Sequence, residues 1–411
     1  MSHGRSVLIA QLRESLTTQR YNASLVVNYC NHAESFLRYL NRRRITIEAA
    51  TPVAVSHYLR CAIRWFHQRH GHSPSPGWSS RPRSSVHALL RLARKRWPPE
   101  PVTSDPCEIL CRSVCREYCE WLTEQRGLAV ASVDDLMWEA RNFLVWYTNR
   151  TSIASFKELC IKDIDAYFTM RAPGLRRRSL KDVAERLRSI LRHLHRTGCT
   201  PVDLAPQIIM PRLYAYENIP SALNPEQISA VLKSTRKDKS PIGLRDYAIL
   251  QLLSTYGLRL GEITHLQFND IDWRAETLRI RHSKTGSCTI LPLMKPVGEA
   301  LINYLRRGRP KTDAREIFIR SRAPYRPLSR IYQCVRGRLE MAGVRLRGKR
   351  GPHIFRHARA VSLLRSSVSM KVIGDLLGHR SAEATIPYLK LATEDLRAIA
   401  LEVPEREEVR S

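Results

Sequence analysis

Acidic residues are scarce in this sequence relative to basic ones. Of its 411 residues, 68 are lysine or arginine and only 38 are aspartate or glutamate, which gives a formal net charge of +30. So large an excess of one sign destabilises a compact chain by self-repulsion unless a polyanion offsets it. Nucleic acid is the usual polyanion. Arginine is the commoner basic residue here, and one guanidinium group can bind two oxygens of a phosphate at once. The charge therefore predicts a nucleic-acid partner, and the alternative is a basic surface that serves only solubility.

Long hydrophobic runs are also missing. A membrane-spanning helix needs about 20 consecutive apolar residues, and no run in the sequence approaches that length. Near the N-terminus the apolar run 7–10 is too short for the core of a signal peptide. The sequence therefore predicts a cytoplasmic protein with no membrane partner, in which the ten cysteines are reduced thiols.

The composition is otherwise that of a folded protein. Apolar residues make up 43% and charged residues 26% of the chain, as in ordinary globular proteins. The length suffices for two or three domains. Helical spacing of apolar residues dominates, and a hairpin pattern appears late in the chain. We therefore predict a mainly α-helical fold with a small antiparallel β-sheet, in domains over residues 1–102, 107–216 and 222–411.

The first two predicted domains are helical and resemble each other. Apolar spacing predicts helices over residues 1–70, and a loop over 71–83 precedes a basic helix over 84–97. The second domain repeats this plan, since 36–40 (Phe-Leu-Arg-Tyr-Leu) resembles 143–147 (Phe-Leu-Val-Trp-Tyr). Coincidence between amphipathic helices is the alternative to a true repeat. Arg-rich helices suit the DNA backbone, and the expected DNA contacts here are Arg176, Arg177, Arg178 and Lys181.

Four cysteines, Cys107, Cys111, Cys115 and Cys119, occupy every fourth position at the start of the second domain. On a helix they would spread over roughly 18 Å, too far to share one zinc ion. We predict a buried stripe of small residues and no metal site.

The third domain follows a proline-rich stretch. Asn224 and Pro225 fit the N-cap and first position of a helix, and a later apolar helix runs from Arg245 to Tyr256 and ends at Gly257. The remaining predictions are strands over 277–282 and 289–293 with a turn over 283–287, and helices over 296–307, 329–342 and 354–401.

The residues that suggest chemistry lie in this last domain. His353 and Arg356 stand three residues apart, the segment 376–379 (Leu-Leu-Gly-His) follows, and Tyr388 comes nine residues after His379. Arginine and histidine donors can stabilise an anionic phosphate oxygen, and a tyrosine hydroxyl can act as a nucleophile. Short patterns of this kind also occur by chance, so residues earlier in the chain are needed to show whether this one marks a catalytic site.

Two earlier motifs complete an ordered set. The segment 257–262 (Gly-Leu-Arg-Leu-Gly-Glu) contains Arg259, and Lys284 lies on the predicted turn. Arg, Lys, His-x-x-Arg, His and Tyr in this order resemble the signature of the tyrosine recombinase (phage integrase) family. The resemblance covers residues 224–395 well, whereas the helical domains before it resemble the core-binding domain of the family only in pattern. It implies a site-specific DNA recombinase built as a multidomain DNA clamp, with the small sheet in a C-terminal catalytic domain.

The resemblance also implies roles for the catalytic set: Arg259, Lys284, His353, Arg356, His379 and Tyr388. The two arginines would bind the non-bridging oxygens of the scissile phosphate, and the tyrosine would attack the phosphorus to form a 3′-phosphotyrosine. The lysine would protonate the leaving 5′-oxygen, the first histidine would help take the tyrosine proton, and the second would donate to a phosphate oxygen. No metal, ATP or other cofactor is expected, because the side chains supply the charge and the covalent link conserves the bond energy. His357 and Arg359 are expected to contact DNA or support the site.

Partners and biological role follow from the same resemblance. It implies double-stranded DNA and a homotetramer, or a heteromer with related recombinases, on synapsed sites. The tail beyond the tyrosine ends in acidic residues and is expected to dock on a neighbouring subunit. The extra first domain favours a mobile-element recombinase that acts in DNA integration or transposition. Ser367 stands where many members of the family have glycine in a turn.

Two alternative functions stay open: type IB topoisomerase-like strand relaxation, and DNA binding by a catalytically decayed protein. Two residues of the catalytic set also have structural alternatives. Arg259 could form only an ion pair with Glu262, and Lys284 could be an ordinary turn lysine.

Overall fold

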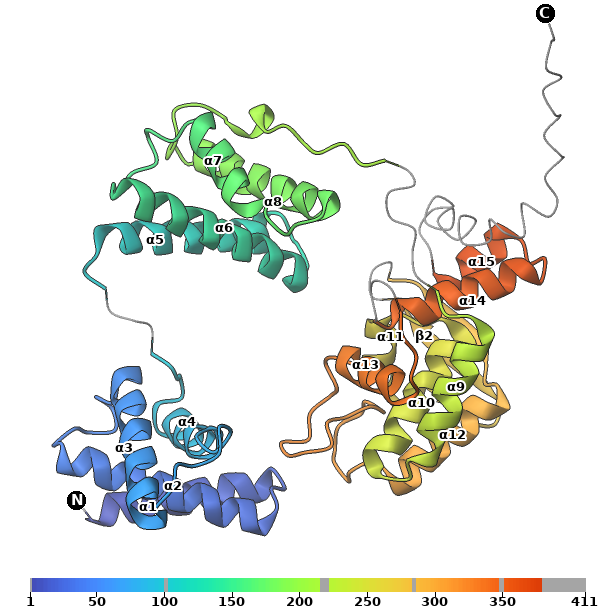
Figure 1. Cartoon of the computed structure of the whole chain (residues 1–411), viewed down its shortest axis with the longest axis horizontal. Coiled ribbons are helices and arrows are strands. Elements are labelled where there is room, and N and C mark those ends of the chain that lie inside the picture. Colours follow the sequence, from blue (N-terminus) through green and yellow to red (C-terminus); the bar gives the residue numbers. More distant parts are fainter. Residues whose placement is uncertain (1, 100–102, 215–221, 283–285, 347–350, 379–411) are drawn as a thin grey trace, which may run out of the picture. The chain divides into compact units, whose positions relative to one another are not determined.

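The computed structural model describes residues 2–99, 103–214, 222–282, 286–346 and 351–378 (Figure 1). The chain is mainly helical, with a three-stranded antiparallel sheet, so the predicted fold class is confirmed. It divides into two compact units, Glu100–Asn218 and, as a single unit, Met1–Pro99 with Ile219–Ser411. Three large hydrophobic cores and one small cluster, Ala360 with Ile373 and Leu377, lie within the described residues. The division into three domains stays a prediction. None of the described helices is both long and apolar enough to cross a bilayer.

Four helices form the N-terminal bundle: α1 (Ser2–Thr18), α2 (Ala23–Arg42), α3 (Pro52–His70) and α4 (Ser80–Arg94). Their ends follow local chemistry. The side chain of Thr51 accepts a hydrogen bond from the backbone N–H of Ala54, and Pro52 occupies the first turn of α3. Gly71 ends that helix in the left-handed conformation, with φ 71°.

The basic helix of this bundle begins earlier than predicted. The sequence predicted a loop up to residue 83, but α4 begins at Ser80 and ends at Arg94, short of the predicted residue 97. Pro82 suggested a loop, yet it lies in the first turn, where a missing N–H is tolerated because those groups have no helical partner. Lys95, with φ 57°, leaves the helical conformation.

The second unit contains another bundle: α5 (Pro106–Glu120), a π-helical turn η1 (Trp121–Gln125), α6 (Val130–Thr151), α7 (Ile161–Arg171), α8 (Arg177–Arg196) and a short turn η2 (Ala205–Gln207). Helix α8 exposes most of its arginines, with Arg186 and Arg188 half-buried, and it buries Leu187, Ile190 and Leu194 against the core. Cys111 and Cys115 are buried on α5, as expected for a buried stripe of small residues. Cys107 and Cys119 are only half-buried. Among the described side chains, no cluster of three His, Cys, Asp or Glu could hold a metal.

The two bundles share an aromatic arrangement that supports the repeat. Phe36 meets Tyr58 edge to face with ring centroids 5.1 Å apart, and Phe143 meets Tyr167 edge to face at 5.1 Å. In each bundle the phenylalanine also stacks on the aromatic residue three positions later, at 6.4 Å in the first and 6.3 Å in the second. Corresponding sequence positions therefore occupy corresponding places in the two cores.

The C-terminal part folds around a central helix. Its elements are α9 (Pro225–Lys237), α10 (Pro241–Tyr256), α11 (Leu260–Thr264), η3 (Phe268–Asp270), β1 (Ile271–Asp272), β2 (Thr277–Arg281), β3 (Cys288–Pro292), α12 (Lys295–Arg307), α13 (Tyr332–Met341), α14 (His353–Arg365) and α15 (Met370–Leu377). The strongly apolar α10 is surrounded by α9, α12, α13 and α14 (Figure 1). Because most of its faces are covered, its sequence is apolar nearly all round.

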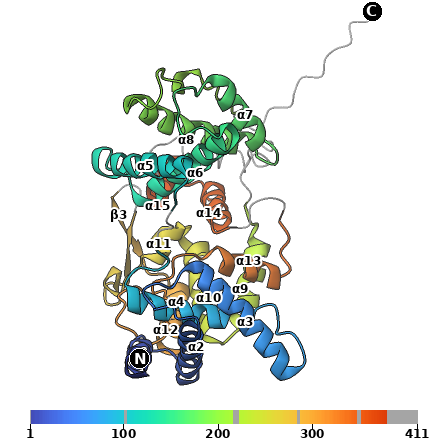
Figure 2. The same cartoon turned by 90° about the vertical axis from the view of Figure 1, so that its left-hand side faces the viewer.

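The sheet has the order β1-β2-β3 and lies at one side of these helices (Figure 2). Strand β2 pairs antiparallel with β3, with Leu278 opposite Leu291. Leu278 and Ile280 point into the core, while Arg279 and Arg281 alternate outward. Strand β2 lies within its predicted range of 277–282, and β3 begins and ends one residue before its predicted range of 289–293. The two-residue β1 has too short a pattern to be predicted.

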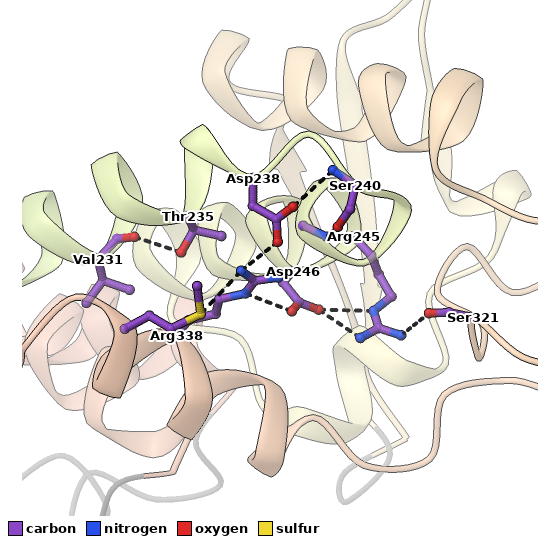
Figure 3. A network of polar contacts seen from close by, with 10 residues as sticks. Val231, Thr235, Asp238, Ser240, Arg245, Asp246, Ser321 and Arg338 are labelled. Carbon is purple, nitrogen blue, oxygen red and sulfur yellow. Dashed lines mark hydrogen bonds and ion pairs between the residues drawn. The ribbon is translucent and has the colours of Figure 1, made fainter.

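A buried polar network joins α9, α10 and α13 (Figure 3). The Arg338 guanidinium donates from Nε to Asp246 at 2.9 Å and pairs through Nη1 with Asp238 at 2.8 Å. Arg245 donates to the other oxygen of Asp246 at 2.9 Å and to Ser321 at 2.9 Å. Asp246 and Arg338 are both buried, and each pairs with a second charged group, Arg245 for the aspartate and Asp238 for the arginine, so the buried charges compensate one another.

The helical range predicted over 354–401 is divided by a turn. Helix α14 ends at Arg365, and α15 begins at Met370 with Ser369 as its N-cap. Between them Ser367 has φ 58°, the left-handed conformation that glycine adopts without strain. The turn therefore lies where the family resemblance placed it, with serine in glycine's conformation. The rest of the predicted helical range, 379–401, lies outside the described residues.

Candidate active site

The site is built where α10, α11, α14 and α15 meet. Gly257 ends α10 with φ 67°, and a Cβ there would lie 3.1 Å from the Leu377 side chain, 3.3 Å from that of Arg359 and 3.4 Å from the Arg356 backbone. A side chain at this position would be strained in conformation and crowded in space. The glycine thus allows α14 and α15 to approach the chain just before Arg259.

Arg356 lies in the first half of α14 and is buried, with 4% of its surface exposed. Its Nη1 donates to the carbonyl of Gly257 at 3.0 Å, and its Nη2 donates to the carbonyl of Leu377. The side chain therefore ties the end of α10 to the end of α15. A buried guanidinium is stable here because carbonyl oxygens receive its protons.

Arg259 is the N-cap of α11 and is held by a carboxylate. Glu262 accepts from the Arg259 backbone N–H at 2.7 Å and from its Nη1 at 3.0 Å. The Nη2 of Arg259 donates to the carbonyl of Gly378 at 2.8 Å. The ion pair with Glu262 that the sequence left open as an alternative does form, but Arg259 also reaches across to α15.

The two guanidinium groups converge, although they lie far apart in the sequence. Arg356 binds the carbonyl of Leu377 and Arg259 binds that of the next residue, Gly378. These carbonyls are at the C-terminus of α15, where the helix presents unpaired acceptors and a partial negative charge. Two adjacent guanidiniums form a donor set suited to the oxygens of a phosphate group.

The remaining predicted residues of α14 line up beside Arg356. His353 begins the helix and is exposed one turn before the arginine, and its ring centroid lies 6.3 Å from that of His357. Arg359 is half-buried, burial lowers the pKa of its guanidinium, and its Nε contacts no acceptor within the described residues. The structure thus brings Arg259, Arg356 and His353 to one region, with His357 and Arg359 adjacent in sequence and partly buried.

Three predicted catalytic residues, Lys284, His379 and Tyr388, lie outside the described residues. Two of their neighbours in the sequence are described. His282 lies two residues before Lys284, and Gly378 immediately precedes His379. A Cβ on Gly378 would lie 2.5 Å from the His282 ring. The two chain segments that lead to Lys284 and His379 therefore touch.

Sequence reasoning missed His282, which lies behind Arg259. The Nδ1 of His282 is 2.7 Å from Oε1 of Glu262, and its Nε2 is 2.8 Å from the Thr289 hydroxyl. Both His282 and Glu262 are buried, and hydrogen bonds from Arg259 and His282 outweigh burial and lower the pKa of Glu262. A signal existed, because residue 282 continues the inward-facing positions 278 and 280 of β2, where a histidine needs polar partners.

The predicted DNA contacts of the second unit lie at the start of α8. Arg176, Arg177 and Arg178 are exposed. The Arg177 guanidinium lies over the Tyr214 ring at 5.1 Å, and Arg178 and Lys181 pair with Asp182 and Glu185 one turn along at 3.4 and 3.8 Å. Exposed pairs of this kind are weak, so they leave the basic groups available for another anion.

The sequence of this chain resembles those of known integrases and recombinases. The Phage integrase family matches residues 221–395. The chain is 66% identical over 186 residues to y4gC of Sinorhizobium fredii strain NGR234, named as an integrase/recombinase, a match that covers 45% of this chain and 97% of that protein. It is 34% identical over 290 residues to the integrase/recombinase y4rA of the same strain, covering 70% of each chain.

A solved structure has the same fold. XerH site-specific recombinase, bound to palindromic difH substrate in a post-cleavage complex, aligns with a TM-score of 0.56 and 16% identity over 73% of this chain and 98% of that one. Identity this low speaks for fold alone, whereas the two relatives establish descent. The chain belongs to the phage integrase family, the tyrosine recombinases that carry out site-specific DNA recombination.

Proposed function

We propose that this protein cuts and rejoins double-stranded DNA through a 3′-phosphotyrosine link to Tyr388. The observation that carries the proposal is the convergence of Arg259 and Arg356 on the carbonyls of Gly378 and Leu377. A phosphate bound there would exchange these carbonyls for its non-bridging oxygens. The guanidiniums would then stabilise the charge that develops at the pentavalent phosphorus.

The reaction balances without an outside energy source. The Tyr388 oxygen forms a bond to phosphorus as the bond to the 5′-oxygen breaks, and the freed 5′-hydroxyl later reverses the step on a partner strand. Lys284 would protonate the leaving oxygen, His353 would help take the tyrosine proton, and His379 would donate to a phosphate oxygen. We propose that no metal, ATP or other cofactor takes part, because cationic side chains supply the charge.

The assembly is part of the proposal. Cutting and exchanging two duplexes needs two sites held together, which the family resemblance assigns to a homotetramer or a heteromer with related recombinases. Arg176, Arg177, Arg178 and Lys181 would bind the DNA backbone, and His357 and Arg359 would contact DNA near the cleaved phosphate. The likeness to named integrase/recombinases favours strand exchange over topoisomerase-like relaxation, and a role in integrating or transposing a mobile element. The proposed place of action is the cytoplasm.

A covalent trapping experiment tests the proposal. Nicked duplexes from a randomised pool should yield a protein–DNA adduct that survives denaturant and forms in EDTA. Tyr388→Phe should abolish the adduct by removing the nucleophile, while DNA binding in a gel-shift assay stays within about threefold. Adduct formation by the phenylalanine variant, or a strict need for Mg²⁺ in the cleavage step, would contradict the assignment.

A further inference from the structure

His282 has no part in the proposed chemistry, yet it lies behind the group that does. Its side chain is buried, with 2% exposed, at the end of β2. Both ring nitrogens meet protein atoms, Glu262 on one side and Thr289 on the other. A ring enclosed in this way cannot reach a substrate, so any contribution to the reaction must pass through its neighbours.

The first neighbour fixes Arg259. Oε1 of Glu262 lies 2.7 Å from Nδ1 of His282 and also accepts from Nη1 of Arg259 at 3.0 Å. An ionised carboxylate only accepts hydrogen bonds, so Nδ1 carries the proton and Nε2 faces the Thr289 hydroxyl. The imidazole thereby holds the carboxylate in the one orientation that also serves the Arg259 side chain and backbone.

The second neighbour is the other anchor of Arg259. A Cβ on Gly378 would lie 2.5, 2.6 and 2.8 Å from Cε1, Nδ1 and Nε2 of His282, so the ring packs directly against the glycine backbone. The carbonyl of the same glycine accepts from Nη2 of Arg259 at 2.8 Å. One imidazole thus contacts both groups to which the guanidinium is bonded.

The backbone of His282 also bonds across the segment 283–285, which contains Lys284 and lies outside the described residues. Its backbone N–H donates to the carbonyl of Ser287 at 2.9 Å, and its carbonyl accepts from the N–H of Gly286 at 2.8 Å. The backbone of His282 therefore bonds to residues 286 and 287, while its side chain contacts Glu262 and Gly378, the two residues that hold Arg259.

We propose that His282 is a positioning residue for Arg259, acting through the Glu262 carboxylate and the Gly378 backbone. The inference rests on the proposed function, since it concerns the guanidinium that would bind the scissile phosphate. Groups that orient a metal ligand from behind change activity by roughly 10- to 100-fold when removed, and we expect a loss of the same order for a group that orients Arg259. The loss belongs to cleavage and not to DNA affinity, because most of the affinity comes from phosphate contacts elsewhere.

The test compares variants of the full chain in single-turnover cleavage of the nicked duplex that the unmodified protein captures best from the randomised pool. His282→Leu, which has no donor, should cleave roughly 10- to 100-fold more slowly, with the dissociation constant of the duplex unchanged within about threefold. His282→Asn keeps an N–H within reach of Glu262 and should recover most of the loss. Equal rates for the leucine variant and the unmodified protein would overturn the inference, as would an asparagine variant no faster than the leucine one.

One further variant separates positioning from stability. Ile280→Ala removes a buried side chain from the same face of β2 without touching Glu262. It should lower the melting temperature but leave the cleavage rate near normal well below that temperature. A cleavage loss in Ile280→Ala as large as that in His282→Leu would mean that stability alone explains both, and would overturn the inference.

A double-mutant comparison identifies the route. In a Glu262→Gln background, His282→Leu should add little to the loss, because the route through the carboxylate is already broken. Fully additive losses would show that His282 acts independently of Glu262 and would overturn the inference. Absence of any adduct with the unmodified chain would overturn the proposed function itself, whereas normal adduct formation by every His282 variant would overturn only its positioning role.

Discussion

Arg259 and Arg356 belong to one site but differ in how far their side chains are buried. Arg356 is 4% exposed and joins α10 to α15, while the Arg259 side chain is 21% exposed. Both are held by carbonyl oxygens before any phosphate arrives. This arrangement keeps the two guanidiniums oriented, so little reorganisation is needed when the charged ligand binds.

Replacing either arginine by alanine should lower single-turnover cleavage by roughly 100- to 1000-fold, the usual cost of removing one electrostatic donor. Each substitution should also lower the melting temperature, because each removes a donor from two acceptors: two carbonyls for Arg356, and one carbonyl and the buried Glu262 carboxylate for Arg259. The control is Arg336→Ala, an exposed arginine of α13 paired with Glu340. Cleavage by either active-site variant at the rate of this control would contradict the roles proposed.

Ser367 illustrates strain at the scale of one residue. Its φ of 58° is unfavourable for a side chain with a Cβ, at a cost of about 1–2 kcal/mol. Ser367→Gly removes the strain but adds chain entropy to the unfolded state, so we expect a net gain in unfolding free energy of up to about 1 kcal/mol.

The neighbouring Ser366 provides the matched control. It has φ −85° and bonds through its hydroxyl to the carbonyl of Ser362. Ser366→Gly should therefore lower the unfolding free energy by about 0.5–1 kcal/mol. Urea titration of both variants decides the matter, and a Ser367→Gly protein less stable than the parent would refute the account of the turn.

At the scale of an element, α11 depends on its first residues. Five residues form too short a helix to be stable by itself. Glu262 compensates by accepting from the backbone N–H of Arg259 at the N-cap, and its Oε1 binds Arg259 and His282 as well. The helix that presents Arg259 therefore depends on one buried carboxylate.

This carboxylate should make stability sensitive to acid. The pKa of Glu262 is lowered on folding, from an unfolded value of about 4.3. A depressed pKa contributes stability above the unfolded value and loses it as pH falls through the folded value. Below about pH 4.3, the unfolding free energy of the parent should therefore fall more steeply than that of Glu262→Gln. Urea titrations across this range measure the slopes, with Glu299→Gln, an exposed site on α12, expected to follow the parent.

At the scale of the whole molecule, the net charge of +30 predicts that DNA binding depends strongly on salt. The logarithm of the binding constant of the full chain should fall with the logarithm of salt concentration by about 0.9 for each phosphate bound. Replacing Arg176, Arg177, Arg178 and Lys181 together by alanine should make this slope shallower by about 0.9 for each phosphate that the variant no longer binds. Replacing the three arginines by lysine keeps the charge and should keep the slope. A slope that the alanine variant leaves unchanged would place the DNA-binding surface elsewhere.

Local sequence determined much of this fold. Caps and helix breakers such as Asn224 and Gly257 marked helix ends correctly, because they act on backbone groups within a few residues. The alternation of apolar and polar residues in β2 was equally local. The order of the family motifs, although spread over residues 259–388, can be read directly along the chain. The start of α4 was wrong because proline is tolerated in a first turn as readily as in a loop, and the sequence alone does not distinguish the two.

Tertiary structure alone decided how the site is held together. Which carbonyls receive Arg259 and Arg356, and that these carbonyls are consecutive, depends on how α10, α14 and α15 pack. Likewise, His282, Glu262 and Gly378 stand far apart along the chain, and no spacing rule connects an imidazole to a carboxylate and a glycine on two other elements. Sequence patterns report contacts within a turn or a hairpin, whereas the supports of a charged group come from whichever buried polar atoms packing brings within hydrogen-bond distance.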